Sequence, residues 1–132
     1  MTQTFIKIGN QKVDASEVTV PQDRTFRDAW VLNNGAIEID QTVKNKILRG
    51  KVKDEAYRRI IAICPEWKQR NLTAQASILA EKGRDNWTAE ELSAWEVGEA
   101  IWSEIATIRS KSDELEAMDP IPQDYTEDKW WA

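Results

Sequence analysis

The spacing of hydrophobic residues changes once along the chain, close to residue 40. Before that point apolar and polar residues alternate, which is typical of short β-strands. Phe5–Ile8, Lys12–Asp14 and Val18–Val20 follow this pattern, and Pro21 ends it. We therefore expect the first forty residues to form β structure.

The clearest local signal within this region is an Asn-Gly turn. Ala29–Leu32 and Ala36–Ile39 flank Asn33-Asn34-Gly35, and an Asn-Gly pair tolerates the positive φ angles of a tight hairpin turn. The pattern predicts a β-hairpin in which Trp30 and Leu32 share one face of their strand and Ile37 and Ile39 share one face of theirs.

From residue 40 onward the apolar residues follow helical spacing. Asp40 or Thr42 can cap a first helix, which Pro65 ends because proline disfavours helical geometry in the residue before it. A second helix is expected over residues 66–82, with Gly83 as its stop. The apolar stripe expected on the first helix contains Val43, Ile47, Val52, Ala56, Ile60 and Ile63.

A third and longer helix begins at the capping box Thr88–Glu91 and is expected to reach about Met118. Its apolar residues repeat with a spacing of four and three, which is a heptad seam. Either the first helix of the same chain or a second copy of the chain could cover this seam, and the sequence leaves both open. The seam of residues 94–115 consists of Ala94, Gly98, Ile101, Ile105, Ile108, Ser112 and Leu115.

Residues 119–132 form a polar tail in which two prolines favour extended geometry. Trp130 and Trp131 close the tail, and tryptophan is enriched among residues that dominate binding energy. We expect both, together with Tyr125, to dock on their own chain or on a partner. If the tail is a partner anchor, deleting residues 126–132 should weaken binding with little change in melting temperature.

The chain has seven tryptophans among 132 residues. Trp30, Trp67, Trp95 and Trp102 lie on predicted apolar stripes, so packing in the core is the expected role of each. The candidate contacts with a partner are Trp67, Arg70, Ile101, Ile105, Ile108, Tyr125, Trp130 and Trp131.

Composition narrows the functional classes. The net charge is −5, and the basic residues between Lys44 and Arg59 are interrupted by acidic ones, so no basic face for nucleic acid is expected. No stretch approaches the ~20 apolar residues of a membrane helix. The single cysteine, Cys64, lies in an apolar run and is expected to pack as a small hydrophobe.

The residues that usually carry catalysis are sparse. The chain has no histidine and its glycines are scattered singly, so the commonest general base and a glycine-rich phosphate loop are both missing. We expect a protein that is not an enzyme, with no catalytic residue, no metal and no cofactor, which works by binding other proteins.

Three blocks of the sequence resemble those of small proteins encoded in the tail regions of tailed phages and prophages. They are Val20–Leu32 with the following turn and Ile37–Asp40, Cys64–Asn71 with its Pro-x-Trp-Lys-Gln-Arg-Asn motif, and Ile121–Tyr125 through Asp128–Trp131. The last block is similar to the ends of phage tail assembly chaperones and tail fibre assembly proteins. The resemblance implies a role in building the tail or in forming part of it.

The expected fold is α+β, with a β element over residues 1–40, three helices over 41–118 and an extended tail over 119–132. The resemblance implies phage tail or tail fibre proteins as partners, and no nucleic acid or membrane. Two roles remain open: a subunit kept in the virion, or an assembly chaperone that acts in the host cytoplasm and leaves. A small acidic inhibitor of a host enzyme is a third, which requires a one-sided acidic face.

Overall fold

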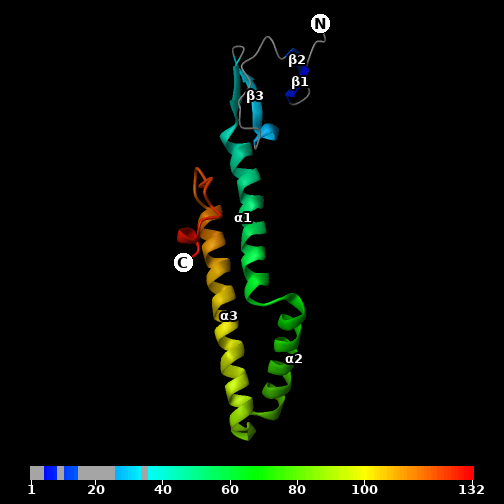
Figure 1. Cartoon of the computed structure of the whole chain (residues 1–132), viewed down its shortest axis with the longest axis vertical. Helices are drawn as coiled ribbons and strands as arrows, with labels where there is room; N and C mark the ends of the chain where they lie inside the picture. The colour runs from blue at the N-terminus through cyan, green and yellow to red at the C-terminus, as the bar shows by residue number, and fades with distance from the viewer. Residues whose placement is uncertain (1–4, 9–10, 15–25, 34–35) are drawn as a thin grey trace.

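The computed structural model describes residues 5–8, 11–14, 26–33 and 36–132. Its elements form an elongated molecule with the strands at one end and the helices extending from them (Figure 1). In chain order they are β1 (Phe5–Ile8), β2 (Gln11–Asp14), the short 3-10 helix η2 (Arg27–Ala29), β3 (Trp30–Asn33), β4 (Ala36–Ile39), α1 (Gln41–Ile63), α2 (Glu66–Lys82), η3 (Arg84–Asn86), α3 (Ala89–Glu116) and η4 (Asp128–Trp130).

The strands form two antiparallel pairs, β1 with β2 and β3 with β4. In the second pair Trp30 lies opposite Ile39 and Leu32 opposite Ile37. Since directly opposed residues share a face, all four side chains lie on one face, which agrees with the predicted hairpin. The turn residues Asn34 and Gly35 and the predicted strand Val18–Val20 lie outside the described residues.

The helix boundaries follow the local signals of the sequence. An oxygen of the Asp40 carboxylate accepts hydrogen bonds from the backbone amides of Thr42 (2.9 Å) and Val43 (3.3 Å). Gly83 ends α2 with a φ of 85°, a conformation that favours glycine. The capping box of α3 is complete, because Thr88 and Glu91 each bond the other's backbone amide. The α+β fold with three helices, the last one long, is therefore confirmed.

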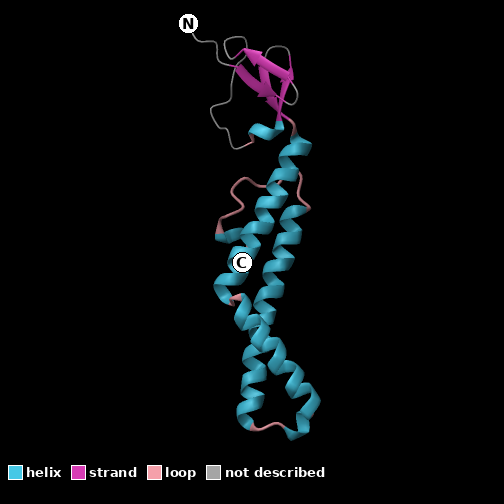
Figure 2. Cartoon of the chain, turned by 90° about the vertical axis from the view of Figure 1, so that its right-hand side faces the viewer, coloured by secondary structure: helices cyan, strands magenta, loops and turns pink. Residues whose placement is uncertain are grey.

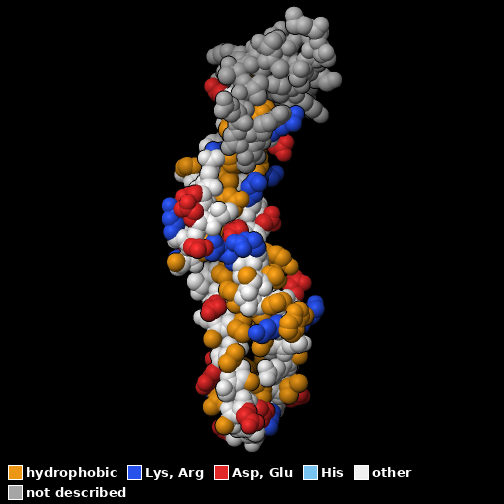
Figure 3. Space-filling model, in the orientation of Figure 1, with side chains coloured by type: hydrophobic (Ala, Val, Ile, Leu, Met, Phe, Trp, Pro, Cys, Tyr) orange, Lys and Arg blue, Asp and Glu red, His pale blue; other side chains and the backbone are white. Residues whose placement is uncertain are grey.

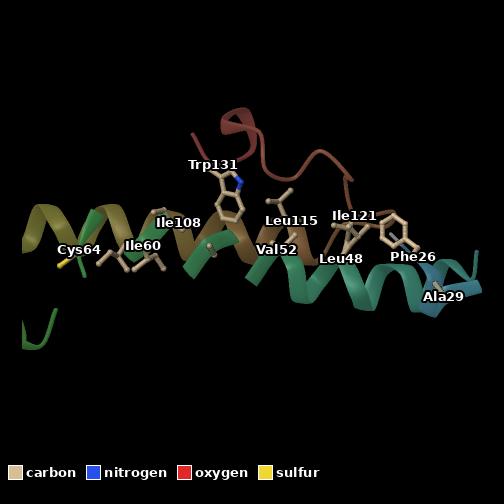
Figure 4. Packing of buried hydrophobic residues seen from close by; sticks show 12 residues of the cluster. Phe26, Ala29, Leu48, Val52, Ile60, Cys64, Ile108, Leu115, Ile121 and Trp131 are labelled. Atoms are coloured by element: carbon tan, nitrogen blue, oxygen red, sulfur yellow. The ribbon is translucent and has the colours of Figure 1, made fainter. Parts of the chain in front are cut away.

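The main core lies between α1 and α3, which run antiparallel along each other (Figures 1 and 4). Leu48 and Val52 of α1 are fully buried, as is Ile105 of α3. Cys64 is also fully buried, as predicted. Burial of one such aliphatic side chain contributes about 1.5–3 kcal/mol. The hydrophobic cluster contains Phe26, Ala29, Leu48, Val52, Ala56, Ile60, Cys64, Ile105, Ile108, Leu115, Ile121 and Trp131.

At the end of the molecule far from the strands, the helical region consists of α2 and the first half of α3 only (Figure 1). After Pro65 the chain enters α2, which lies beside the first half of α3 (Figures 1 and 2). Leu79 is the only buried residue of α2, whereas α1 and the second half of α3 share a continuous core. The molecule is therefore densely packed near the strands and thinly packed at the α2 end.

We predict that Ile105→Asp prevents folding, because Ile105 is fully buried and a carboxylate there would have no partner within the α1–α3 core. Ala106→Asp, at the exposed neighbouring position, is the control and should change the free energy of unfolding by no more than about 0.5 kcal/mol. Circular dichroism during thermal denaturation measures both. A folded Ile105→Asp monomer would show that a second copy, rather than α1, covers the seam.

Candidate functional site

The C-terminal tail docks on its own chain. Its residues turn back from the end of α3 and place the Trp131 side chain against the α1–α3 pair (Figure 4). Trp131 is 6% exposed, and its indole N–H donates a hydrogen bond to the carbonyl oxygen of Tyr125 at 2.7 Å. The guanidinium of Arg59 lies 5.2 Å from the centre of the Trp131 ring, within cation–π distance.

Arg59 ties the tail to α1 through its other contacts. Its Nη2 donates to the carbonyl oxygen of Thr126 (2.8 Å) and to the carboxylate of Asp128 (2.9 Å). Its Nε donates to Glu55 at 3.0 Å. One arginine side chain thus joins a buried carboxylate of α1 to the last turn of the tail.

Glu55 is a buried acidic group on α1, 7% exposed. Arg58 donates from both its Nε and its Nη2, and Arg59 adds a third hydrogen bond. The hydrogen bond from Arg58, and secondarily that from Arg59, hold the pKa of Glu55 below its usual value, although burial acts in the opposite direction. Glu55 is therefore a structural ion-pair group that fixes Arg59 beneath the tail.

The start of the tail is held by Asn45, a buried amide on α1. Its Nδ2 donates to the Asp119 carboxylate at 2.8 Å, and its Oδ1 accepts from the backbone amide of Ile121 at 3.3 Å. Ile121 is 2% exposed. The tail is thus fastened at both ends, and its turns and η4 follow the helices instead of projecting away.

Trp130 and Tyr125 are only partly buried against this cluster. The indole N–H of Trp130 donates to Asp124 at 3.0 Å, and Lys129 lies 5.1 Å from its ring centre. The tail residues proposed as partner anchors are therefore packed within the chain. The expectation that deletion of residues 126–132 changes the melting temperature little does not fit this packing, because Trp131 is part of the core.

The seam candidates are also used within the chain. Ile105 and Ile108 are buried in the α1–α3 core and Ile101 packs against it. The first helix therefore covers the later part of the seam, whereas Ala94 and Gly98 at its start face α2 across the groove. The candidate contacts Ile105 and Ile108 are not accessible to a second copy in the folded chain.

Trp67 differs from its predicted place in the core. Its side chain is 59% exposed on α2, so the prediction that it packs inside is wrong. Arg70, one turn further on, is exposed as well. Trp67 and Arg70 thus remain surface candidates, and Ile78 adds a further exposed apolar side chain to α2 at 65%. Hydrophobic side chains gather over α2 near its junction with α1 (Figure 3).

A groove that the sequence did not indicate lies between α2 and α3. It encloses about 560 Å³, within the range of about 300–1,000 Å³ typical of binding cavities. Gln75, Glu99 and Ser103 supply its polar groups, and its other walls are apolar. Those apolar residues include Leu72, Ala76, Leu79, Trp95, Gly98 and Trp102.

The two walls of the groove touch at Gly98 and are joined at one end by an aromatic pair. A Cβ atom added at Gly98 would meet the Leu72 side chain at 3.7 Å, an ordinary van der Waals distance, so Leu72 of α2 packs toward the α3 backbone at this buried glycine. Trp95, half-buried on the wall, leans on Trp87 with ring centres 5.1 Å apart. Trp87 in turn donates its indole N–H to the carbonyl oxygen of Leu79 at 2.8 Å. This aromatic pair joins the end of α2 to the start of α3 and leaves the groove unfilled.

The α3 side of this region carries only negative charge. Residues 89–108 contain five glutamates and no lysine or arginine. Lys82 pairs with Glu91 at 2.6 Å, and within the described part of the chain the other four have no ion-pair partner. The four are Glu90, Glu96, Glu99 and Glu104.

Two kinds of site are absent among the described residues, a metal-binding cluster and a membrane-spanning helix. Among them no group of three or more histidine, cysteine, aspartate or glutamate side chains could hold a metal ion. The same residues contain no helix with the length and apolar character needed to cross a membrane. Comparison with known proteins gives no match to any family model, curated protein or solved structure.

We predict that Trp131→Ala lowers the free energy of unfolding by about 3–5 kcal/mol, the usual cost of removing a large buried aromatic side chain. For a chain of this length the melting temperature should fall by roughly 10 °C or more. Trp67→Ala is the matched control, because its ring is 59% exposed, and its effect should be much smaller. Equal effects of the two substitutions on the melting temperature would refute the docked tail.

The lowered pKa of Glu55 predicts that its contribution to the free energy of unfolding depends on pH. Its stabilising contribution is fully present above its ordinary pKa of 4.5 and is lost as the pH falls through its lower folded-state value. Glu55→Gln should therefore destabilise the chain most above pH 4.5, with a gap to wild type that narrows at lower pH. Urea denaturation from pH 3 to 7 measures this gap.

Asp54→Asn removes the same charge from the exposed neighbouring position and is the control for Glu55→Gln. It should shift the stability curve little at any of these pH values. A gap between Glu55→Gln and wild type that stays constant from pH 3 to 7 would show that the Glu55 ion pairs contribute nothing that depends on ionisation.

Proposed function

We propose that this protein is a non-enzymatic assembly factor for a bacteriophage tail or tail fibre, which binds a tail protein during assembly and does not stay as a permanent subunit. The observation that carries the protein-binding part is the open apolar groove between α2 and α3. The phage context comes from the resemblance of the three sequence blocks.

The internal packing of the chain supports an assembly factor over a virion subunit. A virion subunit would be expected to depend on its neighbours for order, whereas an assembly chaperone folds alone and leaves an apolar surface exposed. Here Trp131 and Ile121 complete the core from within the chain. The ordered C-terminus therefore needs no partner, while the α2–α3 groove remains free to bind one.

An inhibitor that mimics nucleic acid would need acidic side chains gathered on one face. On the face of the described helices shown in Figure 3, acidic and basic side chains are interspersed. The glutamate side chains of α3 also point in different directions around the helix axis. Glu96 and Glu104 are eight residues apart and thus point about 80° apart around the helix, at about 100° per residue. These observations favour the assembly factor.

The proposal predicts that the protein is plentiful in infected or induced cells while tails are being built and is missing from purified virions. Mass spectrometry of both samples, with peptide abundance compared against the major tail protein, measures this. Purification of the tagged chain from the same lysate should recover a tail or tail fibre protein in stoichiometric amounts.

Two results would contradict the proposal in different ways. Abundant peptides in the virion, in fixed ratio to the major tail protein, would make the chain a structural subunit. Recovery of a host enzyme instead of a tail protein, with the chain missing from virions, would make it a host-directed inhibitor.

A further inference from the structure

We infer that the α2–α3 groove receives a short amphipathic helix of the partner, with an apolar face and flanking lysine or arginine side chains. The inference rests on the proposed protein-binding function and specifies the binding surface. The groove extends from Ala94 to Ser103 along α3, about 14 Å at 1.5 Å per residue. This length suits a helix that inserts side chains from two to three turns.

The surroundings of the groove favour a helical occupant over an extended strand. Both walls are α-helices, whose backbone N–H and C=O groups are bonded within each helix except at the ends. An extended segment would find no strand edge to pair with and would bring its own unbonded backbone into an apolar cleft. A helix satisfies its backbone internally and contributes only side chains, as in other helix-in-groove complexes.

The negative charge beside the groove favours a partner helix that carries lysine or arginine next to its apolar face. Glu99 lies in the groove lining, and Glu96, three residues before it on α3, lies about 60° away around the helix at about 100° per residue; neither has an ion-pair partner among the described residues. Lysine or arginine beside the apolar face of the incoming helix would meet these carboxylates. An acidic helix is disfavoured, because Glu99 is the charged residue of the lining and no lysine or arginine lies there to offset it.

A second copy of the chain is a poorer occupant. A candidate helix of such a copy is α2, where Trp67 and Ile78 are exposed and Lys68 and Arg70 lie close in sequence. Insertion of this helix into the groove of another copy would be a heterologous contact, which leads to a ring or an open filament of copies and not to a two-fold symmetric dimer.

The test uses two fluorescein-labelled peptides with leucine at helical i, i+3, i+4 and i+7 spacing, one with lysine at the remaining positions and one with glutamate. We expect the purified full chain to bind the leucine–lysine peptide, measured by fluorescence anisotropy, and to bind the leucine–glutamate peptide at least about tenfold more weakly. Circular dichroism of the bound lysine peptide should show helix.

Paired variants separate binding in the groove from general attraction to an acidic protein. Ala76→Trp fills the groove and Glu99→Lys reverses its rim charge, and each should weaken binding by about tenfold or more. Ala62→Trp on the exposed side of α1 and Asp113→Lys near the other end of α3 make the same changes outside the groove. These two controls should bind like wild type, and circular dichroism confirms that all four variants fold.

Failure of the groove inference can be told apart from failure of the proposed assembly function. Equal binding of the lysine peptide to all four variants, or no binding, would overturn the groove inference. So would self-association in sedimentation that Ala76→Trp abolishes, because the occupant would then be a second copy. If a tail protein still binds Ala76→Trp as well as wild type, the assembly function stands and the groove is not its site.

Discussion

The structure depends on whether a third element covers the groove between two packed helices. Two helices bury one stripe each against the other and leave a groove on either side, so a stable core needs something more to cover it. Near the strands the C-terminal tail does this, because Ile121 and Trp131 lie across α1 and α3. At the far end α2 and α3 have no third element among the described residues, and a cavity of about 560 Å³ remains between them.

This division follows from helix lengths and from the composition of α2. The 28 residues of α3 extend about 42 Å. Because Pro65 ends α1, that helix packs only along the second half of α3. The rest of α3 can pack only on α2, whose inward residues Ala76 and Leu72 lie near Gly98 and Ala94. Because α2 buries only Leu79, the side chains of the two helices leave part of the space between them unfilled. The groove is therefore already present in the folded chain.

The helix boundaries were predictable because their signals are local: the Asp40 cap, Pro65, Gly83 and the Thr88 capping box each act within a few residues. The tail was not, since Arg59 and Asn45 hold residues about seventy positions away, and no local pattern announces such pairs. Trp67 was assigned wrongly for a geometric reason. Five residues separate it from Leu72, which rotates it about 140° around the helix at 100° per residue, away from the stripe it was placed on. The groove was missed because periodicity identifies which residues face a neighbour but not whether they fill the space between.

The uneven packing also bears on how the proposed assembly factor would release its partner. Local stability follows the number of buried apolar side chains, and α2 buries only Leu79, whereas α1 shares the large core cluster with α3 and the tail. A partner helix in the groove would supply the burial that α2 lacks, so binding and the firm packing of α2 would be coupled. The groove lies outside the cluster formed by α1, α3 and the tail, so a complex there would leave that cluster unchanged. When the partner leaves to bind more tightly within the phage tail, only α2 and the groove would return to their uncovered state. The protein could then bind another partner molecule.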